Sequence, residues 1–95
     1  MKKFIIMNPA DNTAVALTDL AVGFNVTVPP VHGATVQLID PIEFGHKFSL
    51  KIITVGDEVL KYGAVIGRAS QTIEPGQHVH IHNVESIRAR GDKKK

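Results

Sequence analysis

Three short segments of this chain share one pattern, in which an apolar residue is followed three positions later by glycine and six positions later by valine. The copies are Leu20–Val26, Ile53–Val59 and Ile73–Val79. Glycine can adopt a positive φ angle where a side chain would clash, so it favours a tight turn in the middle of each copy. The apolar ends can anchor that turn to a core. Because the copies are unequally spaced, the pattern predicts repeated corners of one compact domain and not a solenoid.

Short segments with β-type composition lie between these corners and are bounded by Gly, Pro, Asn–Pro and Asp–Pro breaks. No segment keeps a 3.6-residue apolar period over three turns. The chain is therefore expected to form an all-β domain of short strands, and the only helical candidate is one turn over residues 41–44. The strands are expected at residues 3–7, 13–17, 25–28, 35–38, 48–52, 58–60, 64–67 and 78–82.

The length of 95 residues fits a single domain with one small core. The sequence has no cysteine, which excludes disulfides and thiolate metal sites. The apolar run after Lys2 and Lys3 is too short for a signal peptide, and no stretch is long enough to span a membrane. We therefore expect a soluble cytoplasmic protein that does not contact a membrane.

The basic character of the chain lies in its last residues. Asp92 is the only acidic residue there, against the cations Arg88, Arg90, Lys93, Lys94 and Lys95. No aromatic residue interleaves with these cations, as a stacking surface for single-stranded nucleic acid would require. We expect a domain over residues 1–87 followed by a basic, solvated tail over residues 88–95, and we do not expect nucleic-acid binding.

Three histidines alternate with two apolar residues in the segment His78–His82. Side chains on a strand point alternately to opposite faces. Val79 and Ile81 are therefore expected in the core, and the three imidazoles are expected together on the other face.

The spacing of these imidazoles limits how they can bind a metal ion. Residues two apart on a strand lie about 7 Å apart at Cα and can share one ion, whereas His78 and His82 lie about 13 Å apart and cannot readily do so. A site would combine His80 with one neighbour and a distant ligand such as His46. Two alternatives need no metal: imidazoles that bind or protonate an oxyanion, or a polar face exposed to solvent.

Two more glycine-marked corners, Gly45–Lys47 and Lys61–Gly63, could each present a lysine to an anionic ligand. The alternatives are lysines that only increase solubility and a Tyr62 that packs in the core. The sequence contains no nucleophile elbow, catalytic triad or phosphate-binding loop. Catalysis by this chain alone is therefore not expected.

Four sequence blocks resemble the N-terminal domain of altronate and galactarate dehydratases, a member of the SAF group of β-clip folds. The blocks are Asp11–Leu17, Gly45–Leu50, Lys61–Gly67 and Gly76–Asn83. They occur in the same order as in that domain, and the resemblance covers residues 3–84. The chain is also similar to the small alpha subunit of sulfolactate sulfo-lyase, although its first block is closer to the altronate enzymes.

This resemblance implies a part in the elimination of water from a sugar acid to give a 2-keto-3-deoxy acid, in an enzyme that uses a divalent metal, usually iron or manganese. The main catalytic domain of that family follows the SAF domain. The resemblance therefore implies a small hydro-lyase subunit, inactive alone, that pairs with a separately encoded large subunit. The alternative is a free-standing module that binds an acidic sugar without catalysis. A homodimer is also plausible, because a domain without its usual neighbour can cover the exposed surface with a second copy.

The resemblance also implies which residues form the site, centred on the histidine strand. We expect metal ligands from His80 and His82, and substrate contacts from His46, Lys47, Lys61, Tyr62, His78 and Asn83.

Overall fold

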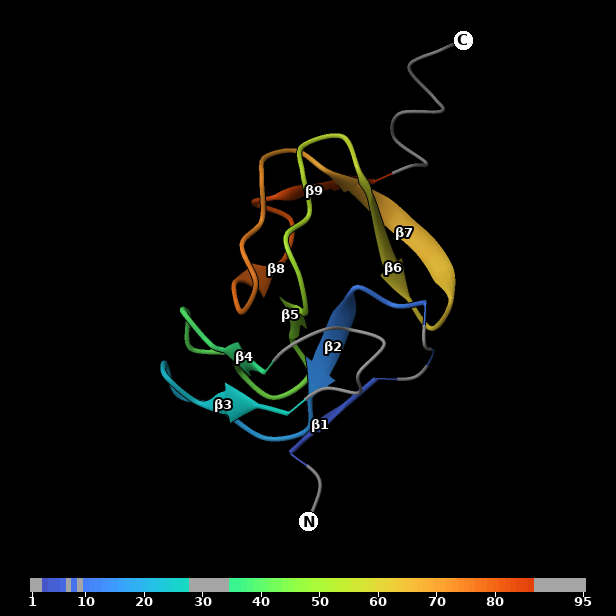
Figure 1. Cartoon of the computed structure of the whole chain (residues 1–95). Helices are drawn as coiled ribbons and strands as arrows, with labels where there is room; N and C mark the ends of the chain where they lie inside the picture. Colours follow the sequence, from blue (N-terminus) through green and yellow to red (C-terminus); the bar gives the residue numbers. More distant parts are fainter. Residues whose placement is uncertain (1–2, 7, 9, 28–34, 87–95) are drawn as a thin grey trace, which may run out of the picture.

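The computed structural model describes residues 3–6, 8, 10–27 and 35–86, and these residues form nine short strands and no helix (Figure 1). The strands are β1 (Phe4–Ile5), β2 (Thr13–Ala16), β3 (Asn25–Val26), β4 (Val36–Gln37), β5 (Lys47–Ser49), β6 (Glu58–Lys61), β7 (Ala64–Ala69), β8 (His78–Val79) and β9 (Val84–Ser86). The all-β prediction is confirmed. The helical turn considered for residues 41–44 does not form, because Ile42 makes an antiparallel bridge with Leu20. In the part of the chain described, no helix is long and apolar enough to cross a membrane.

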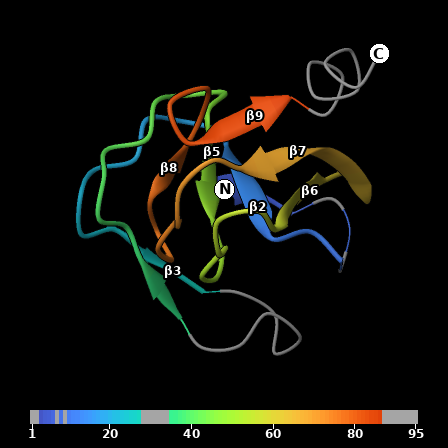
Figure 2. The ribbon, with the colours of Figure 1, turned by 90° about the horizontal axis from the view of Figure 1, so that it is seen from above.

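The strands pair antiparallel in three small sheets, with orders β1-β2-β5-β8, β3-β4 and β6-β7-β9. In Figure 1 the four-stranded sheet lies between the other two, and Figure 2 shows β5 and β8 side by side from a perpendicular direction. The pairing of β5 with β8 aligns Phe48 with His78 and Lys47 with Val79. This register brings the segment after Gly45 next to the histidine-rich segment.

The three predicted glycine corners are confirmed, and the structure adds a fourth at Ile42–Phe48, in which phenylalanine replaces valine. The apolar residues at both ends of every corner are at most 4% exposed. The four central glycines have φ angles between 84° and 90°. Each glycine N–H donates to a carbonyl of a neighbouring segment, namely Gly23 to Leu38, Gly45 to Ala16, Gly56 to Ala69 and Gly76 to Ser49. The sequence repeat therefore encodes one repeated backbone unit.

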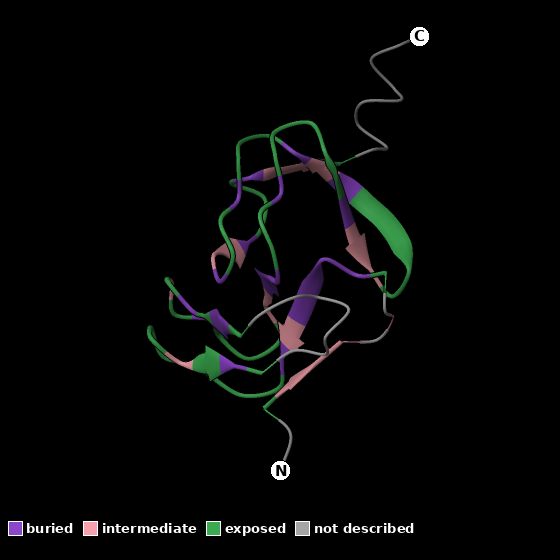
Figure 3. Ribbon diagram, viewed as in Figure 1, coloured by how far each residue is buried: buried purple, intermediate pink, exposed green. Residues whose placement is uncertain are grey.

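Two hydrophobic clusters form the core, one around Phe48 and one around Ile53, Ile73 and Val79. Figure 3 shows the buried residues of β2 and β5 at the centre of the molecule. Phe48 belongs to the first cluster and Val79 to the second, although they lie on paired strands. The β5–β8 pair is therefore held by packing on both faces.

A buried carboxylate ties the start of β2 to the hairpin β6–β7. Asp11 is 3% exposed, and its two oxygens accept hydrogen bonds from the backbone N–H groups of Tyr62 (2.9 Å) and Gly63 (2.7 Å). These two residues form the hairpin turn, and both have positive φ angles. The two N–H hydrogen bonds offset the cost of burying the carboxylate.

The next two residues extend this connection along β6. The Asn12 side chain donates to Glu58 O (2.9 Å) and accepts from Leu60 N–H (2.8 Å), and the Thr13 hydroxyl donates to Leu60 O (2.8 Å). Asn12 and Thr13 are both buried. The sequence block that begins at Asp11 thus joins two sheets through side-chain hydrogen bonds.

We expect Asn12→Asp to lower the free energy of unfolding by about 2 kcal/mol or more, because a carboxylate oxygen would replace the amide donor that faces Glu58 O. The side chain keeps its size, so the loss reports on the hydrogen bond. Urea unfolding at neutral pH measures it. The exposed Asn25 gives the control Asn25→Asp. Equal losses in the two variants would contradict a structural role for Asn12.

Candidate functional site

Three imidazoles converge near the start of β5 and the two ends of β8. His46 immediately precedes β5, His78 opens β8 and His80 immediately follows β8. Directly paired residues on neighbouring strands share a face, so His78 lies on the face of Phe48, and His46 reaches that face from two positions earlier. One nitrogen from each of the three rings lies within 4.8 Å of the others. We call these residues the histidine trio.

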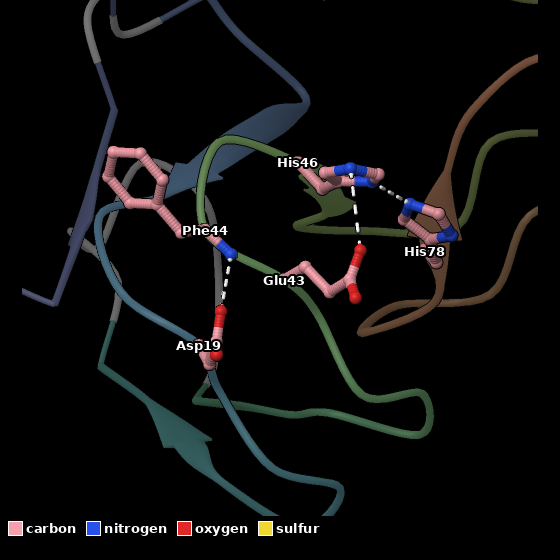
Figure 4. Close-up of polar contacts among 5 residues, drawn as sticks. All are labelled: Asp19, Glu43, Phe44, His46 and His78. Carbon is pink, nitrogen blue, oxygen red and sulfur yellow. Dashed lines mark hydrogen bonds and ion pairs between the residues drawn. The ribbon is translucent and has the colours of Figure 1, made fainter.

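The rings of the histidine trio are in direct contact. His46 Nδ1 lies 2.9 Å from His78 Nε2, so one of these atoms donates a hydrogen bond and the other accepts it (Figure 4). The rings of His78 and His80 stack with centroids 5.5 Å apart and an interplanar angle of 12°. The centroid of His46 lies 5.0 Å from that of His78 and 5.3 Å from that of His80. Imidazole nitrogens grouped in this way are typical ligands of divalent transition metals.

The expectation of a strand over residues 78–82 with Ile81 in the core is wrong. Strand β8 ends at Val79, and Ile81 is 83% exposed in a turn. Asn83 causes this change of direction, because its side chain accepts from His80 N–H (2.9 Å) and donates to His78 O (2.7 Å). Asparagine side chains readily take the hydrogen bonds that a partner strand would make. Val79 is fully buried, as expected.

The expected site residues differ in where the structure places them. Asn83 is fully buried, and its side-chain amide is hydrogen-bonded to the backbone of His78 and His80. His82 is exposed, with its ring centroid 5.5 Å from that of His78. Of the two expected metal ligands, His80 joins the histidine trio and His82 lies at its edge. The combination of His80 with the distant His46, considered from the sequence, is present.

Lys47 lies on the face of β5 opposite Phe48, and Lys61 of β6 is near enough to form a pair of interacting lysines with it. Burial lowers the pKa of Lys47 most, and the positive charge of Lys61 lowers it further. Lys47 also lines an open pocket of about 240 Å³, together with Ile66, Val79, His80, Ile81, Val84 and Ser86. His80 thus belongs both to the histidine trio and to the pocket, which connects the lysine to the imidazoles.

Tyr62 does not pack in the core, because its side chain is 54% exposed at the tip of the β6–β7 hairpin. Lys61 Nζ lies 4.8 Å from the centroid of its ring. A substrate contact from either residue stays a prediction. One contact that the sequence analysis missed is Glu43, whose carboxylate lies near His46. The sequence shows Glu43 two positions before Gly45, but only the fold shows that its carboxylate lies near the ring of His46.

Burial lowers the pKa of His78 most, followed by the positive charges that His46, His82 and His80 carry when protonated, whereas Asp40 raises it. Asp40 also accepts a hydrogen bond from the backbone N–H of His78 (2.9 Å). In the folded chain the neutral form of His78 is therefore favoured.

We expect the metal-free protein to lose stability as the pH falls below about 6.5, the ordinary pKa of histidine. Because folding lowers the pKa of His78, the unfolded chain binds a proton at His78 more readily than the folded chain does. The contribution of neutral His78 to stability is therefore complete above that pH and is lost as the pH falls below it. Melting temperatures between pH 7.5 and pH 5 in the presence of a chelator measure the effect. His78→Gln should flatten the decline more than His82→Gln, and an unchanged slope in His78→Gln would contradict the assignment.

Comparison with known proteins places the chain beside one enzyme family. Residues 2–87 match the family described as the altronate/galactarate dehydratase SAF domain. The chain is 38% identical to altronate dehydratase of Bacillus subtilis over 90% of its own length and 44% identical to altronate dehydratase of Escherichia coli over 88%. It spans only 17% and 16% of the lengths of these two enzymes.

A second group of relatives consists of small subunits. The chain is 43% identical over 52 residues to the alpha subunit of (2R)-sulfolactate sulfo-lyase from Chromohalobacter salexigens. That match covers 55% of each chain. Similar sequences thus occur both as a minor part of a long enzyme and as a named subunit.

Proposed function

Since the chain belongs to the family of altronate/galactarate dehydratase SAF domains, we propose that it is the small subunit of a sugar-acid dehydratase and works with a separately encoded, larger catalytic polypeptide. The reaction removes water from a sugar acid to give a 2-keto-3-deoxy acid. Relatives named altronate dehydratase support the reaction class, and relatives named subunit alpha support the division into two chains. The histidine trio is the part of the site that this chain contributes.

The observation that carries this proposal is the convergence of three imidazoles at the ends of two paired strands. An ion bonded to nitrogens at about 2.1 Å holds its ligands no more than about 4.2 Å apart. Ligand atoms within 4.8 Å of one another need only a small closing movement to reach that arrangement. His46, His78 and His80 therefore fit a divalent metal such as iron or manganese, which would supply positive charge that polarises an oxygen of the substrate.

The lysines fit the acidic part of the substrate. The positive charge of Lys61 lowers the pKa of Lys47, which means that the two ammonium groups repel each other. A carboxylate bound between them would offset this repulsion. A sugar acid bound with its carboxylate near Lys47 would reach His80 across the pocket that the two residues line.

We expect His78→Ala to weaken the binding of Mn²⁺ by more than the roughly 100-fold that loss of an outer-shell partner causes, because it removes the central ligand of the trio. Equilibrium dialysis or the electron paramagnetic resonance signal of free Mn²⁺ measures the affinity. His82→Ala removes a neighbouring imidazole outside the trio and should have a much smaller effect. Equal losses in the two variants would contradict the assigned ligands.

A chimera tests the enzymatic role without a known partner. This chain would replace the matching segment of the Escherichia coli altronate dehydratase, to which it is 44% identical over 84 residues. We expect the chimera to dehydrate altronate and the same chimera with His78→Ala to be inactive, with His82→Ala as the control. Full turnover by the His78→Ala chimera would contradict a role for the histidine trio.

The second candidate function is a free-standing module that binds a sugar acid without catalysis. The lysine pair and the pocket favour it, because both are complete within this chain. A ligand that binds only the folded state raises its stability. Thermal-shift titration of the isolated chain with hexonates and hexarates therefore separates the two functions: a large shift without a partner favours the module.

A further inference from the structure

Glu43 places a carboxylate beside the histidine trio. It lies in the same corner as His46, and its Oε1 is 3.8 Å from His46 Nε2. The Glu43 side chain is 81% exposed, so it can rotate to shorten this contact to a hydrogen bond, while the His46 side chain is only 33% exposed. Figure 4 shows the Glu43 carboxylate directed at the His46 ring, with one ring nitrogen joined to Glu43 and the other joined to His78.

The two nitrogens of His46 therefore face different partners. Nε2 faces the carboxylate, and Nδ1 lies 2.9 Å from His78 Nε2. A neutral imidazole carries one N–H, and a carboxylate can only accept. His46 can donate a hydrogen bond to the Glu43 carboxylate only when its proton is on Nε2, which leaves a lone pair on Nδ1. That lone pair accepts from His78 Nε2–H in the metal-free chain.

We propose that Glu43 is a positioning residue that holds His46 in its Nε2–H tautomer and so presents a bare Nδ1 toward His78 and His80. This inference builds on the proposed metal-binding role of the histidine trio. A carboxylate that accepts from the second nitrogen of a histidine ligand fixes the tautomer and increases the basicity of the nitrogen that binds the ion. Glu43 would have this role for His46.

The repeated corners show that this contact is specific to the site. In the corner Ile73–Val79, Glu74 has the position of Glu43 and Gln77 has the position of His46. Gln77 Oε1 turns back and accepts from the backbone N–H of Glu74 (2.9 Å). In the corner Ile53–Val59, Asp57 likewise accepts from Thr54 N–H (3.2 Å). His46 instead directs its ring to His78 and Glu43, so the same backbone unit serves a different purpose here.

The decisive measurement is the tautomer of His46 in the metal-free chain at about pH 8, read from long-range ¹H–¹⁵N correlations of ¹⁵N-labelled protein. We expect the Nε2–H form in the unmodified chain. Glu43→Gln replaces the carboxylate by an amide that can donate or accept, so both tautomers should then be populated. Glu74→Gln changes the equivalent residue of the matching corner and should leave His46 unchanged.

A second measurement follows the same variants with Mn²⁺. Loss of a partner of this kind weakens metal binding about 10–100-fold, so Glu43→Gln should show a loss in that range and Glu74→Gln should not. A proton on Nδ1 of His46 in the unmodified chain, or identical tautomers in Glu43→Gln and the unmodified chain, would overturn the inference. If the tautomers change as expected but the unmodified chain binds no Mn²⁺, the role of Glu43 holds and the proposed metal function fails.

Discussion

Gly76→Ala is expected to lower the free energy of unfolding by roughly 3 kcal/mol or more, a large part of the stability of a small domain. A Cβ at this position would lie 2.2 Å from Gln37 O and 3.1 Å from Leu38 Cα. Both are backbone atoms and cannot move aside without disturbing the pairing of β4 with β3. The φ angle of +84° adds about 1–2 kcal/mol of strain for any residue with a side chain.

The matched control for this prediction is Gly56→Ala in another corner. Gly56 has a φ angle of +90°, and an added Cβ would meet no atom within 4 Å. This variant should lose only the strain of about 1–2 kcal/mol. Urea unfolding of both variants measures the difference. Equal losses would mean that the corner containing Gly76 does not pack closely against the segment after β4.

Val79→Asp is expected to prevent folding, because it places an unpaired carboxylate in a small core at a cost of several kcal/mol. Val79 is fully buried in the cluster formed with Ile53 and Ile73. Val79→Ala, which should cost about 2 kcal/mol, keeps the test measurable if the aspartate variant does not express.

Ile81→Asp is the matched control two residues further along. Ile81 is 83% exposed, so the substitution should change stability by no more than about 0.5 kcal/mol. Circular dichroism melts of the variants measure both effects. A regular strand over residues 78–82 would make the two positions equivalent, so a comparable loss in Ile81→Asp would contradict the turn held by Asn83.

The corners could be predicted from the sequence because each depends on residues within seven positions of one another. A glycine with positive φ between two apolar anchors is a local requirement, and the three copies ending in valine were recognisable. The copy ending in Phe48 was missed because the pattern specified valine, whereas the fold requires only a buried apolar side chain. Strand β9 was missed because its three residues carry no pattern and depend on pairing with β7.

The sequence by itself therefore determined the all-β class, the glycine corners and the burial of Val79, and it supplied candidate residues for binding a metal or an anion. Only the tertiary structure decided which of these residues meet. The pairing of β5 with β8 joins His46 to His78 and His80 across more than thirty residues of chain. The hydrogen bonds of Asn83 turn Ile81 out of the core and end β8. Contacts between distant segments depend on strand register and on competition for backbone hydrogen bonds, neither of which a local pattern of residues specifies.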